Sequence, residues 1–599
     1  MPIQADRSHR IALALIGVLA CVVMLPALDN DFAFDDPSII LDNQLVASPS
    51  ALHRIFISPY WSSSREAHDL YRPFTIASFW LNYRISGPDP FSFHLVNVLL
   101  HALVSVMVAV TLERRFGSRA AALCAAALFA VHPVHADAVA SAVGRAELLA
   151  AAGALGAWLL RERRASSCIL YAFGMLSKEN AIVAPALMLI EDLVRRRRPE
   201  WKRQYLPLLA VALGFLALRT FVLGGGRIEA VEGPLHGVAA GTRILTAVST
   251  FAHYLLLMLF PARLTPHYWY DRVPLQTSLL SPGFLAGAAC LVLFMGAAWW
   301  LRRREPAISA GLLIYMCALL PASNLILPTG ILMAERLLYL PSVGFCLAAG
   351  ALIASGSWSN RRQRAARLVV LCALTAILSV RTWRAAESWK DDTTIASVAV
   401  AVAPASGPAR YFLGAAHLNA RRWSDAEREL RWSLELLPGG TPDSALAHAG
   451  LGTTLHAQGR LDEAEGEYRA ALRDLPGSGR THFNIGVTLE ALGRLPEAAA
   501  SYDQARRLNP SDAQSLNNLG RVLLELGRTD EAVTVLREAV ALKPGEAIPA
   551  GNLAAGLLAQ GDLDEAERVA MDVLSRSPDN PAARRIVEQI RQRHTDPTQ

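Results

Sequence analysis

Residues 486–510, GVTLEALGRLPEAAASYDQARRLNP, contain the pattern that decides the fold of the C-terminal part of the chain. In this stretch Gly486 is followed after 12 residues by Ala498, after 7 more by Ala505, and after 5 more by Pro510. The same spacing recurs every 34 residues, apart from a four-residue insertion at 439–442. The other four units begin with small residues at Gly414, Gly452, Gly520 and Ala554.

This spacing predicts pairs of packed helices. Small residues let two helices approach closely, and the proline ends the second helix of each pair. Each hairpin then buries its apolar face only against its neighbours. A 34-residue helical unit is typical of tetratricopeptide repeats. We therefore expect an α-solenoid of five repeats over 407–580, followed by a capping helix and tail over 581–599. Such a solenoid favours a protein or peptide as binding partner.

The rest of the chain is too apolar for a soluble enzyme. Of 599 residues, 52% are hydrophobic and only 18% are charged, whereas soluble domains are about 25% charged. This composition excludes a disordered chain and a disulfide-stapled mini-domain. All seven cysteines lie in apolar runs without C-x-x-C spacing, so we expect neither disulfides nor a zinc site.

Long apolar runs predict a polytopic helical bundle over 1–382, joined to the repeats by a linker over 383–406. A spanning helix needs about 20 mostly apolar residues. Two further apolar runs, 73–86 and 244–260, contain polar residues and are expected to be interfacial or re-entrant. The eleven expected spans are 11–28, 91–112, 119–135, 137–160, 166–177, 179–194, 204–223, 282–301, 307–327, 334–356 and 364–382.

The arginines predict the orientation of this bundle. Loops rich in Lys and Arg stay in the cytoplasm, and with eleven spans all six basic clusters fall on one side. The N-terminus is then cytoplasmic and the repeats lie on the opposite side. The net charge of +6 is thus a topology signal, and no nucleic-acid partner is expected. The clusters are Arg7 and Arg10; Arg114, Arg115 and Arg119; Arg161, Arg163 and Arg164; 195–198 with Lys202 and Arg203; 302–304; and Arg361, Arg362 and Arg364.

Polar and charged side chains gather on the side opposite these arginines. The first outer loop, 29–72, begins with an acidic stretch that contains the adjacent carboxylates of Asp35 and Asp36. A shared outward-facing cavity would explain why the other groups fall on the same side. These groups are Arg72, His132, His135, Arg145, Glu147, Lys178, Glu179, Glu335 and Arg336.

Each group also has a structural interpretation. Asp35 and Asp36 can cap a helix or simply be solvated. His132 and His135, three residues apart, are more typical of interfacial histidines than of zinc ligands. Lys178 with Glu179, and Glu335 with Arg336, can be helix-end charges that reach toward the interface.

Together the groups fit the transfer of a sugar from a lipid-linked phosphosugar. A carboxylate would take the proton of the acceptor hydroxyl, and cations would stabilise the departing phosphate. The lipid tail would stay in the bilayer, so membrane lipid is a partner. No motif for a nucleotide-binding loop, a serine hydrolase elbow or a zinc protease is present.

Several short motifs together resemble the transmembrane and tetratricopeptide-repeat O-mannosyltransferases. The motifs are Phe34-Asp35-Asp36, 70–73 (LYRP), 132–135 (HPVH), 143–148 (VGRAEL), 177–179 (SKE) and 335–342 (ERLLYLPS). The resemblance covers nearly the whole chain. It implies a type C glycosyltransferase fold, a polyprenyl-phosphate donor that carries mannose, and Ser or Thr hydroxyls on a protein acceptor.

By this resemblance Asp35 or Asp36 is the general base of an inverting transfer. Arg72, Arg145, Lys178 and Arg336 are expected to bind the donor phosphate. His132, His135, Glu147, Glu179 and Glu335 are expected to support the same pocket, without a cofactor or a bound metal. The arginine- and alanine-rich composition indicates a bacterial protein, which places the site and the repeats at the periplasmic face of the inner membrane.

Two other classes of function stay open. A non-enzymatic scaffold, anchored by the spans, would use the repeats to recruit envelope-assembly proteins, but it leaves the outward-facing charges unexplained. A transporter would place charges near the bilayer midplane and would show two related halves.

Overall fold

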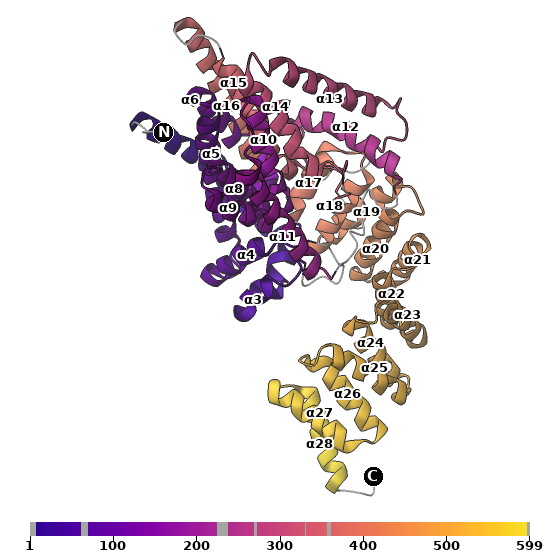
Figure 1. Cartoon of the computed structure of the whole chain (residues 1–599). Helices are drawn as coiled ribbons and strands as arrows, with labels where there is room; N and C mark the ends of the chain where they lie inside the picture. The colour runs from indigo at the N-terminus through magenta and orange to yellow at the C-terminus, as the bar shows by residue number, and fades with distance from the viewer. Residues whose placement is uncertain are drawn as a thin grey trace. The chain divides into compact units, whose positions relative to one another are not determined.

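The computed structural model describes residues 7–61, 70–224, 238–266, 268, 272–326, 328–329, 331–355 and 361–595. Every regular element among these residues is a helix, so the prediction of an all-α chain is confirmed. Contacts divide the chain into two units, Met1–Ala403 and Pro404–Gln599 (Figure 1). Each unit has its own core and is described by itself.

Six helical segments of the first unit are long and apolar enough to cross a membrane. Five of them coincide with expected spans, and the sixth, α12, does not. They are α5 (Pro90–Phe116), η5 with α8 (Ala142–Leu159), η7 with α11 (Trp201–Val222), α12 (Ala240–Leu259), α13 (Pro282–Leu301) and α16 (Arg361–Glu387).

The helix α12 bears on the expected number of spans. At 244–260, which we expect to be an interfacial or re-entrant helix, the structure shows one continuous helix of 20 residues. Its polar residues are accommodated by the fold, because Tyr254 is buried and the His253 ring lies 3.1 Å from the carbonyl oxygen of Ser249. The segment therefore meets the length and composition of a span.

The remaining apolar helices are shorter. At a rise of 1.5 Å per residue, 14 residues extend only about 21 Å, against a hydrocarbon core of about 30 Å. The count of eleven spans therefore stays a prediction. These helices are α1 (Arg7–Val23), α4 (Pro73–Ser86), α9 (Arg164–Ser177), α10 (Ala184–Val194), α14 (Pro306–Leu319) and α15 (Pro341–Ala354).

The expected span 119–135 is broken. The helix α6 (Arg119–Ala130) ends before His132, and the chain continues through η4 (Pro133–His135) and α7 (Ala136–Ala140) after a bend of 55°. Pro133 has no N–H group for a helical hydrogen bond, so it favours a break here. The bend brings the residues that follow into the interior of the bundle.

Glycines set the closest helix contacts of this unit. A Cβ atom on Gly344 of α15 would lie 2.4 Å from the backbone nitrogen of Tyr315 on α14. A Cβ on Gly350 would lie 2.6 Å from the carbonyl oxygen of Ala121 on α6. Small residues that let backbones approach in this way are typical of packed membrane helices.

The acidic outer segment is folded rather than extended. It contains short helical turns that pack on a cluster including Ile40, Tyr60 and Phe79. Residues 62–69 of the expected outer loop 29–72 lie outside the described part of the chain. The turns are η1 (Leu25–Asp29), η2 (Pro37–Leu41), α2 (Gln44–Ala47), η3 (Pro49–Ala51) and α3 (Leu52–Ile55).

Residues 383–406, expected to be a linker, are mostly helical. They contain the end of α16 and the helix α17 (Asp392–Val402), in which Ile395, Ala396 and Ala399 are buried. The boundary between the two units falls between Ala403 and Pro404. Residues 383–403 are therefore part of the first unit.

The second unit consists of five helical pairs and one final helix, as the 34-residue period predicts. A Cβ on Gly486 would lie 2.7 Å from the Tyr502 ring, which shows why the first helix of each pair carries a small residue there. The helices are α18 (Gly407–Asn419), α19 (Trp423–Leu436), α20 (Pro442–Ala457), α21 (Leu461–Asp474), α22 (Gly479–Ala491), α23 (Leu495–Leu508), α24 (Ala513–Glu525), α25 (Thr529–Leu542), α26 (Ala547–Gln560), α27 (Leu563–Arg576) and α28 (Pro581–Thr595).

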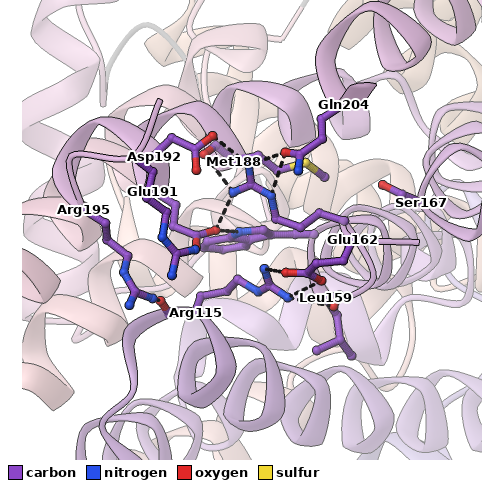
Figure 2. A network of polar contacts seen from close by, with 12 residues as sticks. Arg115, Leu159, Glu162, Ser167, Met188, Glu191, Asp192, Arg195 and Gln204 are labelled. Atoms are coloured by element: carbon purple, nitrogen blue, oxygen red, sulfur yellow. Dashed lines mark hydrogen bonds and ion pairs between the residues drawn. The ribbon is translucent and has the colours of Figure 1, made fainter. Parts of the chain in front are cut away.

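Several arginines of the basic clusters are paired with carboxylates. Figure 2 shows Glu191 and Asp192 of α10 facing a guanidinium group, that of Arg161, whose nitrogens lie 2.8 and 2.7 Å from the two carboxylates. In the same view Arg115 contacts Glu162 at 2.6 Å. These arginines join the ends of α5, α8 and α10, so they have a structural role besides their effect on topology.

Candidate functional site

A strained turn presents the two aspartates. Phe34 has φ of 62°, in the left-handed region that a bulky residue rarely adopts. Its backbone N–H donates to Oδ1 of Asp392 at 2.7 Å. The N–H of Asp31 also donates to the carbonyl of Lys390, at 2.9 Å. The segment around α17 therefore holds the turn in place.

Asp36 is buried and saturated with hydrogen bonds. Its Oδ1 accepts from the N–H of Val143 at 2.8 Å and the hydroxyl of Ser141 at 3.3 Å. Its Oδ2 accepts from the N–H groups of Ala142 at 3.2 Å and Ala33 at 3.4 Å. Burial raises the pKa of Asp36 to about 7, although these backbone donors lower it. Asp36 thus ties the acidic turn to the start of η5 and α8.

Asp35 is the more accessible of the two aspartates. It is only partly buried, and it lies close enough to Arg336 and Tyr60 to raise the pKa of both groups. A carboxylate that keeps some exposure beside a cation is suited to contact a substrate.

Arg72 forms an ion pair at the start of α4. Its Nε and Nη2 donate to one oxygen of Glu179 at 3.1 and 3.0 Å, and its guanidinium lies 5.3 Å from the centre of the Tyr60 ring. Burial acts to lower the pKa of Arg72, but Glu179 outweighs it and the pKa is raised. Both groups therefore stay charged.

Lys178 lies next to this pair in the chain. Its ammonium is bonded to Glu147 of α8, and the amide of Asn180 lies 3.5 Å from the other oxygen of Glu147. Burial, together with Arg72 and Arg336, lowers the pKa of Lys178 against the opposing effect of Glu147. Both arginines therefore act electrostatically on the ammonium group of Lys178.

Arg336 is contributed by η9 (Glu335–Leu338). Its Nη1 lies 3.6 Å from Oδ1 of Asp137, and its backbone N–H donates to Oδ2 of the same residue at 3.0 Å. Burial acts to lower the pKa of Arg336, but Asp137 outweighs it. The broken helix pair α6 and α7 therefore positions the third cation.

Glu335 points to a different set of partners. One of its oxygens accepts from the N–H of Thr265 at 2.6 Å and the hydroxyl of Tyr268 at 2.7 Å. Burial raises the pKa of Glu335 to about 8. Glu335 therefore anchors η9 to the segment after α12.

Arg145 differs from the other expected phosphate ligands. The side chains of Arg72, Lys178 and Arg336 keep exposed fractions of 14%, 10% and 19%, whereas Arg145 has 0%. Its donors meet protein acceptors on α4 and α5, which are Asn97 at 2.9 Å, Asn82 at 2.8 Å, the Phe93 carbonyl at 2.9 Å and the Ser78 carbonyl at 3.3 Å. These contacts indicate that Arg145 joins helices.

The two histidines are also buried among protein partners. Nε2 of His132 lies 3.1 Å from the Met258 carbonyl, and Nε2 of His135 lies 2.9 Å from the Ser342 hydroxyl. The His135 ring packs 4.8 Å from that of Tyr339. Within the described ranges, no three His, Cys, Asp or Glu side chains are grouped to hold a metal ion.

The structure adds residues to the site that the sequence did not single out. Tyr60 stacks on Arg72, Asp137 pairs with Arg336, and Asp392 holds the turn before Asp35. Asp137 follows His135 by two residues, so it lies in the same expected outer stretch. Nothing in the local sequence marks Tyr60 or Asp392, because their roles depend on contacts between distant segments.

Parts of the chain match known protein families. Residues 72–223 match the dolichyl-phosphate-mannose-protein mannosyltransferase family. Residues 411–479, 483–547 and 523–590 match tetratricopeptide repeats. The chain is a homologue of the transmembrane and tetratricopeptide-repeat O-mannosyltransferases. The first match begins at Arg72 and includes Glu147 and Lys178.

Curated relatives contain both parts. Protein O-mannosyl-transferase F38B6.6 of Caenorhabditis elegans is 28% identical over 73% of this chain and 64% of its own length. Protein O-mannosyl-transferase TMTC3 of Mus musculus is 30% identical over 79% of this chain and 56% of its own length. The chain therefore spans less than two thirds of either relative. Among solved structures, the tetratricopeptide protein YrrB matches at 20% identity and a TM-score of 0.29, over 31% of this chain and 95% of that chain.

Proposed function

We propose that the protein is a membrane glycosyltransferase. It moves a sugar, mannose by analogy with its homologues, from a polyprenyl-phosphate carrier to Ser or Thr hydroxyls of an acceptor protein. The reaction takes place on the non-cytoplasmic face, in the periplasm of a bacterial cell. The observation that supports this most strongly is that Arg72, Lys178 and Arg336, from three separate segments, are each fixed by a carboxylate. Both arginines lower the pKa of Lys178, and Asp35 acts to raise that of Arg336.

The geometry suits an inverting transfer. The acceptor oxygen attacks the anomeric carbon of the sugar, and the bond from that carbon to the phosphate oxygen breaks. The phosphate leaves with the electron pair, and Asp35 takes the proton of the acceptor hydroxyl. Arg72, Lys178 and Arg336 stabilise the charge that develops on the leaving phosphate. Asp36 and Arg145 position the segments that carry these groups.

The carboxylates beside the cations have a clear role in this proposal. Glu179, Glu147 and Asp137 hold the three cations in place and keep them charged before the donor arrives. Because the partners are already fixed, less reorganisation is needed in the transition state. The tetratricopeptide unit binds the acceptor protein.

Labelled donor tests the proposal. Membranes containing the full chain are incubated with labelled polyprenyl-phosphate mannose, beside membranes with the double variant Asp35→Asn/Asp36→Asn. We expect labelled protein with the wild type and none with the double variant. A labelled nucleotide sugar supplied alone to washed membranes is expected to give no product. Equal labelling by wild type and double variant would favour the scaffold.

The contact between α17 and the acidic turn gives a second expected result. Replacing Asp392 with Ala removes the acceptor for the strained Phe34 N–H, and a small displacement of Asp35 then lowers the transfer rate by about 10²-fold. Asp392→Asn keeps an oxygen at the same place and is expected to retain most activity. Initial rates and thermal unfolding of the two variants check this. Equal rates for Ala and Asn would exclude the positioning role.

A further inference from the structure

A groove runs along α13 and α14, apart from the residues of the proposed transfer site. It consists of two cavities of about 280 and 400 Å³ that share Met295 and Leu313. The first is apolar, and its walls come from α10, α12, α13 and α14. The second lies at the arginine-rich ends of α10 and α13, where Arg196, Arg302 and Arg303 line it together with Trp299.

The length of the groove matches one leaflet of a bilayer. Along α13 its lining residues extend from Arg302 to Leu291, which is roughly 16 Å at 1.5 Å per residue. Half of a hydrocarbon core is about 15 Å. The groove therefore has a charged end at the level of the headgroups and an apolar part that reaches about to the middle of the membrane.

Aromatic residues support this placement. Trp299 and Trp300 lie at the end of α13 and are 68% and 60% exposed, as is typical of residues at a membrane interface. The outer face of α13 is open as well, since Val292 and Leu293 are more than 70% exposed. This face of α13 is therefore suited to contact the acyl chains of the bilayer.

The arginines that line the groove are not paired with carboxylates among the described residues. Arg161 and Arg115, from other basic clusters, are paired with carboxylates. Arg196, Arg302 and Arg303, by contrast, have no ion pair within the described ranges of the chain. The Arg302 guanidinium lies over the Trp299 ring at 3.3 Å, and its Nη1 donates to the Trp299 carbonyl at 2.5 Å, so this arginine has a neutral partner and no carboxylate. The basic end is therefore complementary to an anion.

We propose that this groove binds an anionic glycerophospholipid of the leaflet on the arginine-rich side. The phosphate lies among Arg196, Arg302 and Arg303, and one acyl chain lies along Met295 and Leu313 toward the apolar cavity. Basic pockets between spanning helices are suited to anionic lipid headgroups. None of the lining residues belongs to the transfer site, so this binding is independent of the proposed reaction.

Native mass spectrometry of the full chain, purified in detergent and stripped of lipid, tests the proposal. The probes are phosphatidylglycerol, phosphatidylcholine with the same acyl chains, and inorganic phosphate. We expect retention of phosphatidylglycerol only, and an about 30-fold weaker affinity in the variant Arg302→Gln/Arg303→Gln. The control Arg304→Gln, whose side chain stacks on Trp300 outside the groove lining, is expected to bind as the wild type does.

A second variant tests the apolar part. Met295→Trp fills the junction of the two cavities and is expected to lower phosphatidylglycerol retention without removing a charge. Equal retention of the two lipids, unchanged binding by the arginine variant, or unchanged binding by Met295→Trp would overturn the proposal. Displacement of the lipid by inorganic phosphate would also overturn it, because the site would then recognise the anion alone.

Discussion

Replacing Asp35 with asparagine should lower the rate of sugar transfer by about 10³-fold, within the range that a general base contributes. Asparagine keeps the size of the side chain but does not accept a proton at neutral pH. Asp35 is partly exposed beside Arg336, so the change is expected to leave the fold intact. Initial rates with labelled donor, measured together with the thermal unfolding midpoint, check both parts.

A neighbouring acid provides the matched control. Asp42 lies in the same outer segment and is exposed, so Asp42→Asn should transfer sugar at the wild-type rate. If Asp35→Asn stays within about threefold of wild type, the assignment of the base to Asp35 is lost.

Asp36 should respond differently to the same substitution. Its two oxygens accept four hydrogen bonds, three of them from backbone N–H groups. An asparagine amide would place an NH2 group against at least one of these donors, which leaves buried polar groups unpaired. Activity should therefore fall together with thermal stability in Asp36→Asn, whereas in Asp35→Asn it should fall alone.

The repeats could be predicted from the sequence because their fold depends on local periodicity. Gly486, Ala498 and Pro510 fix helix contacts and helix ends within one unit, and the same rule applies in every unit. The apolar runs were equally clear. The sequence did not predict where helices bend or continue. The bend after α6 and the continuous course of α12 depend on packing between distant helices.

The candidate site was predictable as a set of residues but not as a set of partners. The predicted side of the membrane placed Arg72, Lys178 and Arg336 in one group, and both arginines act on the pKa of Lys178. Sidedness alone did not distinguish these three cations from Arg145, whose guanidinium donates hydrogen bonds to Asn82 and Asn97. Those hydrogen bonds join segments far apart in the chain, so the composition of each segment does not predict them.

The interval expected to be a linker shows the same limit. Its apolar run 395–403 is too short for a span, and the contact that matters comes from the polar residue before that run, because Asp392 holds the backbone of Phe34. A residue 358 positions away thus determines where Asp35 lies. Local sequence does not reveal such a contact, because the strain at Phe34 appears only in the folded backbone.

Replacing Arg336 with glutamine should lower the transfer rate by about 10²- to 10³-fold, as removal of one group that stabilises transition-state charge does in other enzymes. The change also leaves Asp137 buried beside a neutral partner, and an unpaired buried charge is strongly destabilising. Lost activity in the single variant would therefore not separate chemistry from folding.

The double variant Arg336→Gln/Asp137→Asn makes that separation. It removes both charges of the pair, while the amide oxygen at position 137 still accepts the backbone N–H of residue 336. We expect its unfolding midpoint to return toward that of the wild type while transfer stays slow. Arg263→Gln, an exposed arginine two residues before Thr265, is the matched control and should be fully active. Recovery of transfer together with stability in the double variant would show that the Arg336–Asp137 pair only holds the fold, and that the leaving phosphate is stabilised by Arg72 and Lys178 without it.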